Sequence, residues 1–413
     1  MSPLEHSKDR LRALIEEVQR LSGSDFPHRH PSDVLKMVGE IFEQRLSELE
    51  KLDDKNDSLV VQAVCSESLT KVFAFLPLLG FILRSTNVRN SFEVYGPTLR
   101  LTRSLLGNET KLLVSSEWNF SPFVYRPINE LPNVVLIGLP ACESQNPLLL
   151  PLAGHELGHS IWRQKSIGGQ LIPKIRSSVE AEFKRREAEF VKLFPVGTFP
   201  SDPAAGNNLF FIRVLSQVIN LALSRCEETF CDFVGIRLFA EGYLHAFAYL
   251  LAPGASAPRS LQYPCMTDRI TNMLSASTVF GAQPPPNFNG SFIADELATT
   301  TNQDIFFISE VADSALKSLV SDLVDAVRQN IPANIPSRSQ KEIDKVYNAF
   351  KLVVPAAGIE DIANVINAGW KAYGSEDLWN TIPEVFGKRR EVLRDLILKN
   401  FEILEIEEIM RTR

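Results

Sequence analysis

Histidine, cysteine and excess positive charge are all scarce in this chain of 413 residues. There are six histidines, and the five cysteines form no CxxC pair and have an odd count, so a disulfide framework is not expected and the thiols are predicted to be reduced. The net charge of -7 argues against broad nucleic-acid binding, which needs a basic face. The cysteines are Cys65, Cys142, Cys226, Cys231 and Cys265.

The chain also lacks an apolar leader and a long uninterrupted apolar run. Its first residues, MSPLEHSKDRLRALIEEVQRL, are charged and contain no hydrophobic core of a signal peptide. The run VFAFLPLLGFIL, from Val72 to Leu83, contains Pro77 and is shorter than the ~20 residues that span a bilayer. It predicts a buried core helix, so we expect a cytoplasmic protein with no membrane span.

The pattern of apolar residues predicts a mainly α protein with a small β-sheet, an α+β fold. A helical N-terminal region is expected over residues 1–92. A catalytic core is expected over residues 93–280, where KLLVSSEWNFSPFVYRP and NVVLIGLPA predict the strands. A helical C-terminal region is expected over residues 281–413. Within the core, one long buried helix is predicted from about Asn208 to Ala240.

Two of the six histidines stand four residues apart in LPLAGHELGHSIW, as His155 and His159. On a helix this spacing places both imidazoles on one face, where they can bind one zinc ion. Glu156 follows the first histidine and can act as general base toward a water that the metal activates. Such a motif is expected by chance about 0.01 times in this composition. Gly158 is unfavourable in a helix and suggests that something approaches closely there.

A catalytic zinc ion needs a third protein ligand and leaves its fourth position to water. No histidine follows at the spacing of HExxHxxGxxH, so an acid is the better candidate. In CEETFCDFVGIRLF, Glu228 can bind the metal and Asp232, one turn later, can accept a hydrogen bond from a ligating histidine. Glu227 is a rival ligand. Alternatively, these acids pair with Arg225 or Arg237 on the helix surface.

An HExxH motif followed by ExxxD on a second helix resembles the gluzincin zinc metallopeptidases. The resemblance implies that His155, His159 and Glu228 bind zinc. It implies that Glu156 is the catalytic base and that Asp232 orients a ligand. A zincin-like core with helical additions at both ends is the fold that it implies.

This resemblance covers about residues 133–232. In gluzincins a strand usually precedes the active-site helix, and its edge can hold an extended peptide. The segment NVVLIGLPA, residues 133–141, has the corresponding position in the chain.

Peptide hydrolysis also needs a donor for the oxyanion of the tetrahedral intermediate. Tyr263 precedes Pro264, with Arg269 further on, in partial likeness to a His-Pro pair with a downstream arginine in some HExxH families. His245 is the other candidate. For each of these residues the alternative is ordinary packing, or a salt bridge for Arg269.

The sequence therefore predicts a metallopeptidase that uses one Zn²⁺ to cleave a peptide or protein substrate. Two alternatives remain open. One is a non-catalytic or latent zinc-binding protein that works with a regulatory partner. The other is a metal-dependent hydrolase of a non-peptide amide, which would use the same metal ligands.

Overall fold

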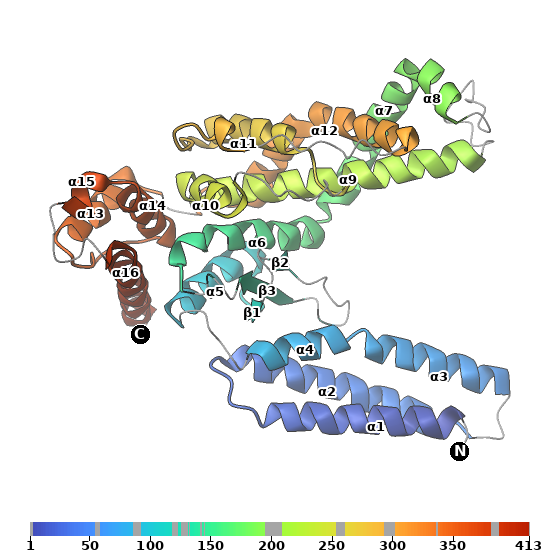
Figure 1. Ribbon diagram of the computed structural model, residues 1–413. Helices are drawn as coiled ribbons and strands as arrows, with labels where there is room; N and C mark the ends of the chain where they lie inside the picture. Colours follow the sequence, from blue (N-terminus) through green and yellow to red (C-terminus); the bar gives the residue numbers. More distant parts are fainter. Residues whose placement is uncertain are drawn as a thin grey trace. The chain divides into compact units, whose positions relative to one another are not determined.

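A computed structural model describes most of the chain. The described residues are 3–53, 58–85, 92–117, 123–124, 131, 133–140, 143, 145–194, 209–252, 261–292, 302–335, 338–380 and 388–412. They are mostly helical with one small sheet, which confirms the predicted mainly α class (Figure 1).

The contacts divide the chain into two compact units. One comprises Met1–Arg103 and Gly107–Gln145, and the other Ser104–Leu106 and Asn146–Arg413. This division differs from the predicted three regions. The sheet packs against N-terminal helices and belongs with them, whereas the helices beyond residue 280 belong to the unit of the HExxH helix and include two that contact the long helix Leu209–Phe239.

Among its described residues, the first unit contains helices α1 to α4, most of α5, and a sheet in order β1-β3-β2. Strands β1 and β3 are parallel, with Lys111 opposite Val134. The segment 133–141 was expected to offer a free edge, but its strand β3 is central: β1 pairs along its whole length and β2 pairs at Ile137 and Gly138. The elements are α1 (Pro3–Ser22), α2 (Arg29–Glu50), α3 (Ser58–Phe73), α4 (Leu76–Ser85), α5 (Phe92–Leu106), β1 (Lys111–Glu117), β2 (Phe123–Val124) and β3 (Val134–Pro140).

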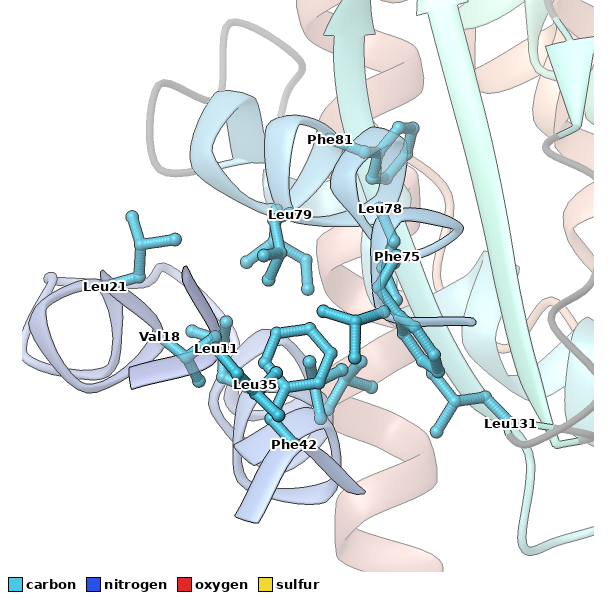
Figure 2. Packing of buried hydrophobic residues seen from close by; sticks show 14 of the residues in the cluster. Leu11, Val18, Leu21, Leu35, Phe42, Phe75, Leu78, Leu79, Phe81 and Leu131 are labelled. Carbon is cyan, nitrogen blue, oxygen red and sulfur yellow. The ribbon is translucent and has the colours of Figure 1, made fainter. Parts of the chain in front are cut away.

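The core of this unit lies between α1, α2 and the α3–α4 segment (Figure 2). Side chains repeat at helical spacing on the facing sides of these helices, and Phe42 of α2 meets Phe75 edge to face at 5.6 Å. Burial of such apolar side chains contributes about 1.5–3 kcal/mol each to folding. The residues labelled in Figure 2 are Leu11, Val18, Leu21, Leu35, Phe42, Phe75, Leu78, Leu79, Phe81 and Leu131.

The second unit is all helical in the residues that the structure describes. Its centre is α9 (Leu209–Phe239), which agrees with the predicted long helix. Figure 1 shows α9 between α6 on one side and α11 with α12 on the other, and each of these helices contacts it. The other elements are η2 (Pro147–Leu149), α6 (Pro151–Gln164), α7 (Ile167–Arg185), α8 (Glu187–Leu193), α10 (Glu241–Leu251), α11 (Met266–Phe280), η4 (Asn289–Ser291), α12 (Gln303–Asn330), α13 (Gln340–Lys351), α14 (Ile362–Tyr373), α15 (Glu376–Asn380) and α16 (Arg389–Thr412).

Two helical stretches, Leu59–Ser85 and Leu209–Phe239, are long and apolar enough to cross a membrane by length and composition alone. Core helices of soluble proteins pass the same test, so the expected absence of a membrane span stays a prediction. Among the described cysteines, Cys65, Cys226, Cys231 and Cys265 are free thiols, and Cys142 lies outside the described residues.

His30 connects the start of α2 to β1 in the first unit. The backbone N–H of Leu112 donates to its Nδ1 at 3.0 Å, and the hydroxyl of Tyr95 lies 2.8 Å from the same nitrogen. Burial lowers the pKa of His30. The positive charges of Arg103 and Lys111 add to this effect, against the opposing hydrogen bond with the Leu112 backbone. The fold therefore favours the neutral imidazole.

We expect this preference to make the first unit less stable in mild acid. Because the pKa of His30 is lower in the folded state, the unfolded chain binds the proton first and stability falls as the pH drops below about 6.5. Denaturant unfolding of the full chain at about pH 7.5 and about pH 5.5 measures the difference. His30→Gln should reduce the pH dependence, and His6→Gln, at an exposed position of α1, should not. An unchanged pH dependence in His30→Gln would contradict this account.

Candidate metal centre

The HExxH motif lies in the buried middle of α6. Asn146 caps the preceding turn by accepting the N–H of Leu148, and Pro151 begins the helix with a preset φ. The rings of His155 and His159 then lie one turn apart, with centroids 5.1 Å apart and nearly perpendicular planes. Both histidines therefore project from the same face of α6, toward α9.

Glycines allow α6 and α9 to pack almost backbone to backbone. A Cβ atom on Gly158 would lie 2.8 Å from the Cα of Cys231, and one on Gly154 would lie 3.4 Å from the Cα of Gly235. The close approach expected at Gly158 is thus present, and its partner is the backbone of α9. A side chain at either position would push the two helices apart.

Glu228 of α9 faces both imidazoles. Its Oε2 lies 3.3 Å from Nε2 of His155, and its Oε1 lies 3.8 Å from Nε2 of His159. Burial opposes ionisation of Glu228, but the nearby imidazoles lower the pKa of its carboxyl overall. Its Oε2 is buried and accepts no well-formed hydrogen bond from the described residues. A buried carboxylate oxygen of this kind needs a compensating cation.

The other ring nitrogen of each histidine contacts an acid. Nδ1 of His155 lies 3.0 Å from Oδ1 of Asp232, and Nδ1 of His159 lies 2.8 Å from Oε1 of Glu227. A carboxylate at Nδ1 holds the proton there and leaves Nε2 as the free donor atom for a metal. Asp232 therefore has the contact that the sequence analysis proposed for it. Glu227, named there as a rival ligand, instead contacts the back of the second imidazole.

Asp232 is itself held from two sides. Arg269 of α11 donates to both carboxylate oxygens, at 2.6 and 2.8 Å, and the hydroxyl of Tyr243 donates to Oδ1 at 2.7 Å. Burial opposes the charge of Asp232, but Arg269 and His155 together hold its pKa below the ordinary range. Burial also disfavours a charged His155, yet Asp232 and Glu228 outweigh it and raise the pKa of His155 to about 10.

The two arginines proposed as alternative partners of these acids contact other groups. Arg225 is buried and pairs with Asp313 of α12 at 2.7 Å. Arg237 donates to the carbonyl groups of Pro332 and Ala333. Glu228 and Asp232 therefore point away from the helix surface and toward α6.

Cys231 is a second candidate for the third ligand. One ligand atom from each of His155, His159 and Cys231 can be chosen so that all lie within 4.8 Å of one another. Glu228 does not belong to this group, although its Oε2 lies 3.3 Å from Nε2 of His155 and its Oε1 lies 3.8 Å from Nε2 of His159. Burial and the surrounding acids also raise the pKa of the Cys231 thiol well above its ordinary value.

The two predicted oxyanion donors have different surroundings. Tyr263 is 41% exposed, and its ring centre lies 5.6 Å from Cζ of Arg269. The negative charge of Glu228, together with burial, raises the pKa of Tyr263 to about 12, so its hydroxyl stays protonated and can donate. Tyr263 thus lies beside Arg269, the residue that pairs with Asp232.

His245 is not brought to this cluster. Its ring stacks on Trp370 of α14, with centroids 5.2 Å apart, and burial lowers its pKa to about 4. Two positions along a helix differ by about 200° in direction. Because Tyr243 faces Asp232, His245 faces the other side of α10. Tyr243 is the contact that the sequence analysis missed, since it depends on how α10 turns back on α9.

Comparisons with protein-family models, with curated proteins and with solved structures find no match to this chain. The resemblance to the gluzincins therefore rests on the motif residues alone and stays a prediction.

The close packing of α6 and α9 predicts a specific sensitivity to added side chains. Gly158→Ala should lower the free energy of unfolding by about 1–3 kcal/mol, because its methyl group would overlap the backbone of Cys231. Gly169→Ala is the control, since no atom of another element lies within 4 Å of its Cβ position on α7. It should stabilise the chain by up to about 1 kcal/mol through helix propensity. Denaturant unfolding compares the two, and equal effects would contradict the packing argument.

Proposed function

We propose that this chain is a zinc-dependent metallopeptidase with a zincin-like centre that hydrolyses peptide bonds. One observation carries the proposal. The carboxylate of Glu228 on α9 lies 3.3 Å from Nε2 of His155 and 3.8 Å from Nε2 of His159 on α6, while separate acids contact the Nδ1 atoms of both histidines.

The residues present fit a zinc ion. Two imidazoles and one carboxylate are a ligand set that zinc prefers in hydrolases, and three protein ligands leave a position open. The buried Oε2 of Glu228, which lacks a well-formed hydrogen bond, supports a cation at this point. Zinc bound here would polarise the scissile carbonyl and promote deprotonation of water.

The side chains around the ligands supply the remaining functions. Glu156 is buried next to His155 in the motif, and its carboxylate would take a proton from the attacking water and pass it to the leaving amine. Tyr263, with a raised pKa, would donate a hydrogen bond to the oxyanion. Asp232 and Glu227 would keep the Nδ1 protons of the two ligating histidines in position.

A peptide or protein substrate and a cytoplasmic location belong to the same proposal, as does the absence of nucleic-acid binding at a net charge of -7. The motif does not distinguish a peptide from another amide, so a hydrolase of a non-peptide amide remains an alternative with the same centre.

One specific observation favours a different function. If Cys231 joined His155, His159 and Glu228, four protein ligands would surround the ion, and closed sites of this kind are structural. The chain would then be a non-catalytic or latent zinc protein that acts through a regulatory partner. Glu156 argues for catalysis, because a structural site has no use for this acid.

Zinc content of ligand variants separates Glu228 from Cys231. We expect one zinc ion per purified chain, and Glu228→Ala should weaken its binding by about 100-fold or more. Cys231→Ala should change the affinity by less than about threefold, because a small residue is all that the packing against Gly158 requires. Competition with a chelator of known affinity measures both variants. A larger loss in Cys231→Ala than in Glu228→Ala would overturn the assignment.

Replacement of Glu156 separates metal binding from hydrolysis. Glu156→Gln should retain zinc and lower kcat/KM on a peptide library by about 10²–10⁴-fold, because the general base is lost while the ligands remain. Glu180→Gln, on the surface of α7, is the control and should leave both quantities unchanged. Full hydrolysis by Glu156→Gln would remove the proposed base. Absence of chelator-sensitive hydrolysis in the wild-type chain would favour the structural alternative.

A further inference from the structure

The turn between α9 and α10 is strained. A single residue, Ala240, separates the two helices, and it has φ 51° and ψ -124°. Glycine adopts this region readily, whereas a residue with a Cβ does so at a cost of about 1–3 kcal/mol. Such a conformation persists only where the surrounding structure holds it. The turn therefore depends on contacts from outside α9 and α10.

Asn367 of α14 provides these contacts on both sides of Ala240. Its Nδ2 donates to the carbonyl of Phe239 at 3.0 Å, and its Oδ1 accepts the N–H of Gly242 at 2.8 Å. The carbonyl of Phe239 is at the end of α9, and the N–H of Gly242 is in the first turn of α10. Backbone groups at these helix ends have no hydrogen-bond partner within their own helix. One buried amide thus ties the two helix ends together.

The turn directs α10 back along α9 and brings Tyr243 onto Gly235. A Cβ on Gly235 would lie 2.4 Å from the ring of Tyr243, so only a glycine leaves room for this contact. The hydroxyl of Tyr243 then donates to Oδ1 of Asp232, and it lies 3.3 Å from Nδ1 of His155. The same Asp232 oxygen contacts Nδ1 of His155 at 3.0 Å.

We infer that Asn367 is a positioning residue for the metal centre, acting through the strained turn at Ala240 and through Tyr243 on the Asp232–His155 pair. The inference gives the C-terminal helices a function in the site, and it rests on the proposed metal centre. The hydrogen bonds of the Asn367 side chain join it to Phe239, Gly242 and Ala363, and none of these is a proposed ligand. Asn367 fixes the position of the Tyr243 hydroxyl relative to Asp232. Because Asp232 contacts Nδ1 of His155, this position also determines the orientation of the His155 ring.

A double-mutant cycle in the full chain tests this chain of contacts. Tyr243→Phe removes the hydroxyl and keeps the ring on Gly235, and Asn367→Ala removes the tie across the turn. Each should weaken zinc binding by about 10-fold, as expected when a group behind a ligating histidine is lost. The double variant should bind no more weakly than the weaker single variant, because both changes break the same path.

Asn364→Ala is the matched control. Asn364 is a buried asparagine about one turn earlier on α14, and its side chain bonds to Ser339 and Glu342. It should leave the zinc affinity within about twofold of the wild-type value. Circular dichroism and thermal unfolding confirm that every variant is folded at the assay temperature. Equal losses in Asn364→Ala and Asn367→Ala, or additive losses in the cycle, would overturn the inference.

The inference and the proposed function can fail separately. If the wild-type chain binds neither zinc nor cobalt, the proposed function fails. The ring nitrogens of His155 in ¹⁵N-histidine-labelled protein then decide the inference. Tyr243→Phe and Asn367→Ala should both shift these His155 signals, and Asn364→Ala should not. Unchanged His155 signals in Asn367→Ala would overturn it.

Discussion

The backbone contact between α6 and α9 is the constraint on which the candidate site depends. Because Gly154 and Gly158 carry no side chain, Cys231 and Gly235 of α9 lie directly against α6. At this separation, a histidine on one helix and a carboxylate on the other can approach to hydrogen-bond or ligand distance. An interaxial spacing widened by even one methyl group would separate the atoms that now converge. Helices α7, α10, α11, α12 and α14 also contact α9.

Charge is unevenly distributed around this contact. Asp232, Glu228 and Glu156 act on His155, and Glu227 contacts His159. Arg269 donates two hydrogen bonds to Asp232. Buried carboxylates are stable only with cationic or hydrogen-bonding partners. The negative charges of Asp232, Glu228 and Glu156 favour the protonated form of His155 and so raise its pKa. A divalent cation would balance these charges from the Nε2 side, so proton and metal would compete for the same ring.

The features of the site that depend on neighbouring residues in the sequence were predictable. The HExxH spacing placed His155 and His159 on one helix face, and the long apolar run predicted α9 within a residue at each end. The contacts of Tyr243 were not predictable in this way. They require a strained Ala240 and an asparagine 125 positions downstream of Gly242, and neither has a periodicity that a sequence pattern can reveal. The grouping of the sheet with the N-terminal helices likewise depends on long-range packing.

The positions of Glu228 and Cys231 on α9 determine how many protein ligands a metal ion at this centre would have. Sγ of Cys231 lies 3.0 Å from the position that a Cβ on Gly158 would occupy, so the thiol fills the interface between the helices. Glu228, one turn earlier, extends past that interface and meets Nε2 of His155. One nitrogen of each histidine and Sγ of Cys231 nevertheless lie within 4.8 Å of one another, so the sulfur is within reach of an ion that the imidazoles bind. The packing therefore leaves Glu228 and Cys231 as rival third ligands, and the proposed open centre depends on Glu228.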